Sequence, residues 1–322
     1  MFACMRPASP PTTEITATAT AGDQPQDTRL LPGLVIVNYG KQALVEDRVG
    51  ELTRCVMRRN LERVVCGDRV QWRRNTDGSG VIEAIESRQS VLQRTAGNRA
   101  ASPLAANLDQ LVITCAPEPG IDLFLVDKYT VAAELAGLEP LIVVNKSDLL
   151  DNADREETEA RLACYQAIGY QCLLTSALHN TGMALLRAQL RNKTSILAGQ
   201  SGVGKSSLIG RLLPDLDIEI GRLSAASGQG RHTTTATTLY HMPEGGDLVD
   251  SPGVRDFHPG AMNPGQLAHG FREFRGYDGQ CRFSDCLHNG EPECAVAVAV
   301  AAQLIDARRM QSYHRMLEAQ TG

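Results

Sequence analysis

Long apolar runs, aromatic side chains and excess positive charge are all scarce or missing in this chain of 322 residues. No apolar run reaches the about 18 residues that a membrane-spanning helix needs, so we expect no membrane partner. Aromatic residues make up 4% of the chain, with a single tryptophan, Trp72. The net charge of −5 argues against nucleic-acid binding through overall charge, although local basic patches stay open.

The cysteines form no even set for a disulfide framework, because the chain contains nine of them. This excludes a small fold held together mainly by disulfides. We expect six scattered cysteines to be reduced thiols of a cytoplasmic protein, some of them buried in apolar surroundings. These six are Cys4, Cys55, Cys66, Cys115, Cys164 and Cys172.

Residues 1–32 lack the apolar core of a signal peptide and any helical or strand periodicity. The segment is rich in Pro, Thr and Ala, which is typical of a disordered tail. A transit peptide is the alternative, and the low arginine content together with several acidic residues counts against it.

Residues 33–97 show short, partly alternating apolar segments separated by Gly, Asn and Asp turns. Strands of this length and spacing predict a small closed β-barrel. Residues 31–100 contain twelve Lys and Arg against eight Asp and Glu, a balance of +4 in an acidic chain. A basic barrel of this kind is suited to RNA, although many of the arginines would also fit a solvated surface.

Residues 98–260 change to continuous apolar runs alternating with amphipathic segments, which predicts an α/β domain with a parallel sheet. The stretch "GQSGVGKS" at 199–206 fits the phosphate-loop pattern, with a buried strand before it and an apolar helix after it. Lys205 would reach the β- and γ-phosphates of a nucleotide, and the Ser206 hydroxyl would bind Mg²⁺. The loop residues expected to bind the nucleotide are Gly199, Gln200, Ser201, Gly202, Val203, Gly204, Lys205, Ser206 and Ser207.

Two further motifs follow predicted strands, where open α/β sheets bind their ligands. In "NKSD" at 145–148, Asp148 could accept hydrogen bonds from the guanine N1–H and exocyclic amine, with Asn145 and Lys146 beside it. In "TSAL" at 175–178, Ser176 and Ala177 would support the base. Each motif alone is weak, since Asn-Lys-x-Asp also makes a good turn. Together with the phosphate loop they predict GTP rather than ATP.

The hydrolytic machinery is expected between residues 228 and 254. Asp250 of "DSPGV" would hold Mg²⁺ through a water molecule, and the Gly253 amide would sense the γ-phosphate. Thr234 is our choice for completing the magnesium shell, with little to separate it from Thr235. Val254 stands where many GTPases carry a glutamine that orients water, and its apolar side chain cannot do this. His232 is the nearest imidazole in sequence that could take the role of a catalytic residue, and the alternative is a solvated loop histidine.

Residues 261–322 contain the stretch "CRFSDCLHNGEPEC" and a helix expected at about 295–319. Three thiolates and one imidazole make a closed tetrahedral set for a structural zinc ion. The alternative, buried cysteines, is disfavoured because the surrounding residues are polar. The proposed ligands are Cys281, Cys286, His288 and Cys294.

The guanine motifs precede the phosphate loop, the reverse of the usual order. The succession of basic barrel, "NKSD", "TSAL", "GQSGVGKSS", "GRHTTT", "DSPG" and the Cys-x4-Cys-x-His-x5-Cys set resembles the RsgA family of circularly permuted GTPases, also called YjeQ or EngC. The resemblance runs from about residue 33 to the end of the chain and includes "VVCGDRVQW" in the barrel.

This resemblance implies an OB-fold barrel, a permuted P-loop GTPase domain and a zinc-binding helical domain. It also implies a monomer that assists late maturation of the small (30S) ribosomal subunit, contacts its rRNA and hydrolyses GTP with stimulation by the subunit and linked release. Two rival hypotheses are an RNA-binding scaffold with a vestigial nucleotide site and a metabolic P-loop kinase or ATPase.

Overall fold

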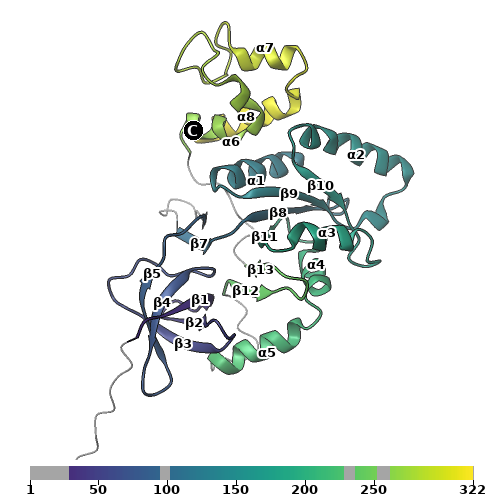
Figure 1. Ribbon diagram of the computed structural model, residues 1–322. Helices are drawn as coiled ribbons and strands as arrows, with labels where there is room; N and C mark the ends of the chain where they lie inside the picture. Colours follow the sequence, from purple (N-terminus) through teal and green to yellow (C-terminus); the bar gives the residue numbers. More distant parts are fainter. Residues whose placement is uncertain (1–28, 95–101, 228–235, 252–261, 322) are drawn as a thin grey trace, which may run out of the picture.

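The computed structural model describes residues 29–94, 102–227, 236–251 and 262–321. A β-barrel lies at one end, an α/β sheet in the middle and a group of helices at the other end (Figure 1). None of the helices in these described ranges combines the length and the apolar character of a bilayer-spanning segment.

The N-terminal strands close into a barrel because β4 pairs with β1 as well as with β5. The strands are β1 (Leu31–Asn38), β2 (Gln42–Glu46), β3 (Leu52–Met57), β4 (Arg69–Arg74) and β5 (Gly80–Ile85). Trp72 is fully buried in the barrel core. It fits only because Gly33 and Gly80 have no side chain, since a Cβ at either position would lie within 2.8 Å of its indole ring.

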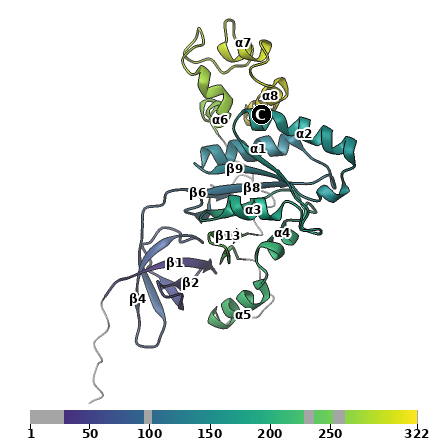
Figure 2. The same ribbon diagram turned by 45° about the vertical axis from the view of Figure 1, so that its right-hand side comes forward.

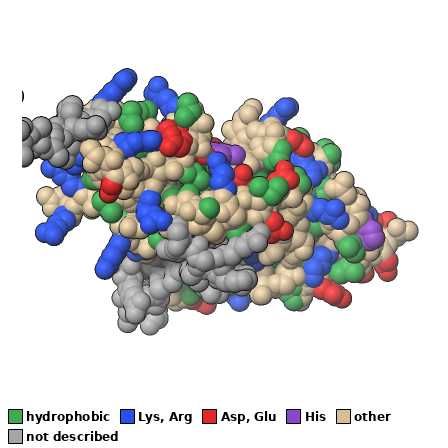
Figure 3. Space-filling model, turned by 90° about the horizontal axis from the view of Figure 1, so that it is seen from below, with side chains coloured by type: hydrophobic (Ala, Val, Ile, Leu, Met, Phe, Trp, Pro, Cys, Tyr) green, Lys and Arg blue, Asp and Glu red, His purple; other side chains and the backbone are tan. Residues whose placement is uncertain are grey.

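The arginine-rich surface of the barrel is partly neutralised by its own acidic residues. Arg73 and Arg58 both pair with Glu83, at 2.8 and 2.9 Å. In the view from below, with the barrel at the left, Lys and Arg side chains project from that end among a smaller number of acidic ones (Figure 3). The barrel therefore presents positive charge without being uniformly basic.

A short ribbon connects the barrel to the central sheet. Strands β6 (Val91–Arg94) and β7 (Ser102–Ala106) pair with each other as a two-stranded sheet, and Ala105 of β7 also forms a single bridge to Cys66 of the barrel. β7 packs closely on the barrel at Gly67, whose φ is +85° and where a Cβ would lie 2.2 Å from the Ala106 carbonyl oxygen.

The central sheet has the order β10-β9-β8-β11-β13-β12, parallel except for β12. Its strands are β8 (Gln110–Cys115), β9 (Glu139–Val144), β10 (Gln171–Leu174), β11 (Thr194–Ala198), β12 (Thr238–His241) and β13 (Asp247–Asp250). Helices α1 (Leu123–Leu135) and α2 (Asn152–Ala167) lie on one side of the sheet, and α3 (Met183–Leu190) and α4 (Lys205–Leu212) on the other (Figure 1). The parallel strands bury apolar side chains on both faces, as the continuous apolar runs predicted.

Helix α5 (Leu216–Ser227) was not anticipated from the sequence. The helix lies beside β2 and β3 of the barrel, below the central sheet (Figure 2). Arg222 of α5 bonds to the Gly50 carbonyl at 3.4 Å, and Arg54 of the barrel bonds to the Ala226 carbonyl at the same distance. The segment before residue 228 is thus ordered against the barrel.

Glu46 of β2 connects the barrel to α5 and β12, the two elements that precede and follow residues 228–235 in the sequence. Its carboxylate lies 2.6 Å from His241 Nε2 on β12 and 3.5 Å from Arg222 on α5. The other ring nitrogen of His241 lies 2.6 Å from Asp247. The hydrogen bonds to Asp247 and Glu46 raise the pKa of His241 from 6.5 to about 10.

A His241→Gln variant tests this charge at the barrel interface. Because the folded-state pKa is raised, its stabilising effect is fully present below about pH 6.5 and is lost as pH rises through about 10. His241 is partly exposed, so we expect a loss of only about 1 kcal/mol at pH 6 and almost none above pH 10. Thermal unfolding of both proteins across this range measures the difference, and a loss that is equal at both ends would contradict the assignment.

The C-terminal helices form a separate core around Phe271, Phe274 and Tyr313. The elements are α6 (Pro264–Gly270), η3 (Arg272–Tyr277), α7 (Ala295–Ala301) and α8 (Ala307–Thr321). The single helix expected over about 295–319 is therefore wrong. It is interrupted at Gln303, whose φ is +56°, and Asp306 restarts the chain as a helix by accepting a 2.8 Å hydrogen bond from the Arg308 amide.

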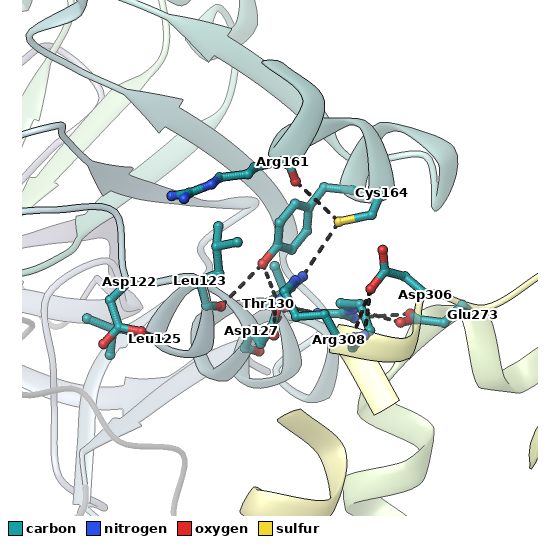
Figure 4. A network of polar contacts seen from close by, with 12 residues as sticks. Asp122, Leu123, Leu125, Asp127, Thr130, Arg161, Cys164, Glu273, Asp306 and Arg308 are labelled. Carbon is teal, nitrogen blue, oxygen red and sulfur yellow. Dashed lines mark hydrogen bonds and ion pairs between the residues drawn. The ribbon is translucent and has the colours of Figure 1, made fainter. Parts of the chain in front are cut away.

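A buried ion cluster attaches these helices to the central domain (Figure 4). Asp127 of α1 is fully buried and pairs with Arg308 at 2.6 Å and Arg309 at 2.8 Å, both from α8. Arg309 also pairs with Glu273 at 2.7 Å, and Tyr165 of α2 donates to Asp127. Because every charge in the cluster has a partner, its desolvation is compensated and the two domains pack in a fixed orientation.

Candidate nucleotide-binding site and metal centre

The phosphate loop leaves β11 and enters α4, as the sequence predicted. Gly199, Gly202 and Gly204 all have positive φ, between +85° and +145°. A Cβ at Gly199 would lie 2.0 Å from the Thr114 carbonyl oxygen, and one at Gly204 would lie 2.3 Å from Asn145 Nδ2. Glycine is required at both positions because the loop passes so close to β8 and to the "NKSD" segment.

The polar groups of this loop lie at the start of α4. Lys205 donates to the carbonyl oxygens of Gly199 and Gln200, each at 2.6 Å, so its ammonium group folds back over the loop. Ser206 and Ser207 are exposed in the first turn of the helix. Backbone amides and the helix dipole at such a terminus attract anions, and Lys205 adds a full positive charge.

Asn145 connects the two motifs that are far apart in sequence. It is buried, donates to the Val203 carbonyl of the phosphate loop at 3.0 Å and accepts from the Ala177 amide at 3.2 Å. The Thr175 hydroxyl also donates to it, at 3.4 Å. One amide side chain therefore links the phosphate loop, the "NKSD" segment and the "TSAL" segment.

Asp148 lies in a short 3-10 turn directly after β9 and is exposed. The Ser176 hydroxyl donates a hydrogen bond to its carboxylate, which lowers the pKa of Asp148 below the usual range. The Asp148 carboxylate is therefore ionised at neutral pH, and its two oxygens can still accept hydrogen bonds from two further N–H donors. Beside it, Lys146 adopts a left-handed backbone and donates to the Glu118 carbonyl at 3.1 Å.

Asp250 ends β13, the strand next to β11. Because β11 and β13 are parallel, the phosphate loop and Asp250 leave the sheet at the same edge. The remaining expected residues, His232, Thr234, Thr235, Gly253 and Val254, lie outside the described residues. The described part of the site thus unites Lys205, Ser206 and Asp250 with the guanine motifs at one edge of the sheet.

The side chains of Cys281, Cys286, His288 and Cys294 meet in the C-terminal domain, with their donor atoms within 4.8 Å of one another. His288 Nδ1 lies 3.6, 3.6 and 3.3 Å from the sulfurs of Cys281, Cys286 and Cys294, and Cys281 and Cys294 are 4.0 Å apart. A tetrahedral zinc site with metal–ligand distances of about 2.0–2.3 Å requires donor separations of roughly 3.5–3.8 Å. The cluster therefore has the geometry of a closed four-ligand metal centre.

The surroundings of the cluster orient its ligands. Tyr313 of α8 donates to the Leu287 carbonyl at 2.6 Å, and the His314 ring lies 2.9 Å from the His288 carbonyl oxygen. Burial raises the pKa of Cys286 to about 12 and lowers the pKa of His288, which favours the neutral forms of these two side chains when no cation is nearby. A divalent cation would replace those protons and bind the thiolates directly.

Two features of the site were missed by reading the sequence. Arg211, at the end of α4, donates to the carbonyl oxygens of Ala177 and Leu178, at 2.8 and 3.2 Å. The link from Asn145 to the phosphate loop was also not foreseen. No local pattern marks either contact, because an arginine in a helix or an asparagine after a strand is common in any protein.

Comparisons with known proteins agree with this geometry. A family model described as RsgA GTPase matches residues 85–259. The small ribosomal subunit biogenesis GTPase RsgA 1 of Vibrio vulnificus (strain YJ016) is 46% identical over 292 residues, which cover 89% of this chain and 83% of that protein. The small ribosomal subunit biogenesis GTPase RsgA of Haemophilus influenzae (strain 86-028NP) is 44% identical over 291 residues, with 89% of this chain and 84% of that protein covered.

Solved structures give the same result for the fold. YjeQ from Thermotoga maritima is similar with a TM-score of 0.76 and 33% identity, covering 91% of this chain and 99% of that one. YloQ, described as a circularly permuted GTPase, has a TM-score of 0.73 and 25% identity, covering 93% and 98%. The expected fold class, a barrel followed by a permuted GTPase domain and a C-terminal region with a Cys/His cluster, is confirmed. The family model spans more than half of the chain and the relatives align along most of their own length, so the chain belongs to the RsgA family of GTPases.

Proposed function

We propose that this protein binds and hydrolyses GTP and assists the late maturation of the small ribosomal subunit. The observation that carries the proposal is the meeting of the phosphate loop, the "NKSD" segment and the "TSAL" segment around Asn145. If residues 199–206 were only a glycine-rich turn, their hydrogen bond to the segment that carries Asp148 would not be expected. The relatives' names, small ribosomal subunit biogenesis GTPase, supply the class of particle on which the protein acts.

The nucleotide would lie along the edge of the sheet from Asp148 to Lys205. Asp148 accepts hydrogen bonds from the guanine N–H groups, and Ser176 and Ala177 support the base. Lys205 and the amides of residues 199–207 bind the phosphates. Magnesium would bind to Ser206 and Thr234, and to Asp250 through water. When bound, the ion neutralises charge on the phosphate oxygens.

The proposed water-orienting group lies outside the described residues. Val254 has no polar group to orient water, so we expect slow intrinsic hydrolysis that a partner accelerates by positioning the catalytic group. His232 is the imidazole we propose for orienting the attacking water. Glu46 of the barrel contacts Arg222 on α5 and His241 on β12, so a particle bound to the barrel could act on these two elements.

The cluster of Cys281, Cys286, His288 and Cys294 is proposed to hold one structural zinc ion. Four protein ligands complete a tetrahedron and leave no position for a substrate. Their arrangement around α7 and α8 suits a role in shaping the C-terminal domain rather than in hydrolysis.

The partner is proposed to be the small ribosomal subunit, contacted through rRNA by the barrel. Single arginines on the barrel, among them Arg48, Arg59 and Arg69, are exposed and could meet phosphates. We propose a cytoplasmic monomer with a barrel domain from residue 33 to 97, a GTPase domain from 98 to 260 and a zinc-binding domain from 261 to 322. The preceding tail, expected over 1–32, is shorter by two residues, because β1 of the barrel begins at Leu31.

GTP hydrolysis with and without purified small subunits tests the function. We expect the parent protein to turn over GTP slowly alone and faster with subunits. A Lys205→Ala variant, which loses the ammonium group, should show a stimulated turnover lower by about 10²- to 10³-fold. The loss of one strong phosphate or oxyanion donor has an effect of this size in other enzymes. A His232→Ala variant that keeps full stimulated turnover would exclude that residue as a catalytic group.

The same assay separates the rivals. A scaffold with a vestigial site would show no turnover even with subunits present, and a kinase or ATPase would prefer ATP and phosphorylate an acceptor. A parent protein that hydrolyses GTP but is not stimulated by subunits would retain the GTPase assignment and contradict the ribosomal one.

A further inference from the structure

The loop that follows β10 is held from inside the site. We call residues 176–181 the base loop, which is closed by a 2.9 Å hydrogen bond from the Ser176 amide to the Thr181 carbonyl. On its inner side, the Ala177 amide donates to Asn145 and the Ser176 hydroxyl donates to Asp148. The position of the base loop therefore decides how the Asp148 carboxylate is oriented.

Arg211 holds the same loop from outside. Its Nε donates to the Ala177 carbonyl at 2.8 Å and its Nη2 to the Leu178 carbonyl at 3.2 Å. The guanidinium has its donors in a rigid fork, so one side chain bonds to two consecutive carbonyls at once. Leu178 is 71% exposed and has little packing of its own, so these two hydrogen bonds are a main restraint on the outer half of the loop.

The position of Arg211 on α4 makes this contact relevant to the nucleotide. The helix runs from Lys205 to Leu212, so its first turn carries the phosphate-loop lysine and its last turn carries Arg211. Arg211 in turn accepts, through its carbonyl oxygen, a 2.7 Å hydrogen bond from Arg187 of α3, the helix that follows the base loop. Among the described residues Arg211 forms no ion pair, so its charge is directed at the loop carbonyls.

We propose that Arg211 is a positioning residue for guanine recognition. It fixes the base loop to the helix of the phosphate loop, so that Ser176 keeps Asp148 oriented while Lys205 holds the phosphates. Arg211 itself touches no nucleotide in this arrangement. The inference rests on the proposed GTP site and adds to it a residue that couples its two ends.

The test compares binding of GDP and of inosine diphosphate to the parent and to Arg211→Ala. Inosine lacks the exocyclic amine, so it makes only one of the two hydrogen bonds to Asp148. We expect GDP affinity to fall about tenfold, which corresponds to about 1.4 kcal/mol, mainly through faster dissociation. Inosine diphosphate should lose less, so the preference for GDP over it should shrink. Arg211→Lys, which retains the charge but not the fork, should fall between the two proteins.

Arg191→Ala is the matched control, since Arg191 is also an exposed arginine that donates to a backbone carbonyl, that of Glu244 at 3.2 Å, away from the base loop. It should bind both nucleotides as the parent does. Unchanged GDP dissociation in Arg211→Ala would overturn the inference, and so would an equal loss for both nucleotides, which indicates a merely structural role. A parent protein that binds no GDP would instead overturn the proposed function itself.

Discussion

Replacing both Cys281 and Cys286 with serine is expected to abolish zinc binding and to unfold the segment from residue 281 to 294. Structural zinc sites contribute on the order of 10 kcal/mol to local folding, because the ligands are not assembled in the unfolded chain. This segment has few apolar side chains of its own, and two that it does have, Phe283 and Leu287, are exposed. Metal analysis should find about one equivalent of zinc in the parent and none in the variant.

Hydrogen exchange locates the effect of losing the metal. Amides near Tyr313 and in α7 should exchange faster in the double variant, whereas those of β8 and β11 should not change. Cys172→Ser is the control, since Cys172 is a cysteine of the central sheet far in sequence from the cluster. Full zinc content in the double variant would show that the ligands are assigned wrongly.

The second large effect is expected at Asp148. In guanine, N1–H and the 2-amino group are both donors, which an ionised carboxylate accepts; in xanthine, the 2-position is a carbonyl acceptor. The amide of an Asp148→Asn variant offers one acceptor and one donor, so it should pair with xanthine instead of guanine. Sites that hydrogen-bond a substrate group discriminate by factors of about 10⁴, so the ratio of GDP to XDP affinity should change by roughly this factor and reverse its direction.

Competition binding of GDP, XDP and ADP to both proteins measures this change. Asp148 is exposed and caps no buried charge, so the variant should unfold at nearly the same temperature as the parent. The amide oxygen of the variant side chain could still accept the hydrogen bond from Ser176, which keeps the loop geometry. An Asp148→Asn protein that retains full guanine preference would contradict the proposed role of this carboxylate.

Much of the secondary structure was predictable from the sequence, because its signals are local. Apolar runs such as that of β8 bury every residue, and the side chains of Asp122 and Asp151 cap the first turns of α1 and α2. The break between α7 and α8 was not predictable, since Gln303 has no unusual helix propensity yet takes the left-handed position that ends α7, where the Leu304 amide bonds to the Ala299 carbonyl. Helix α5 was also missed, and its contact from Arg222 to the Gly50 carbonyl joins residues 172 positions apart.

The chemistry of the motifs follows from the sequence alone: the glycines and lysine of the phosphate loop, the carboxylate suited to guanine, the four metal ligands and their permuted order. The contacts that join distant segments are visible only in the folded chain: Arg211 contacts the base loop, Glu46 contacts His241 and Arg222, and Asp127 contacts Arg308 and Arg309. Distance along the chain explains this difference. The residues of a motif lie a few positions apart, so their pattern can be recognised in the sequence. These contacts join common residue types that are between 33 and 195 positions apart, so only the packing of the folded domains determines which residues come into contact.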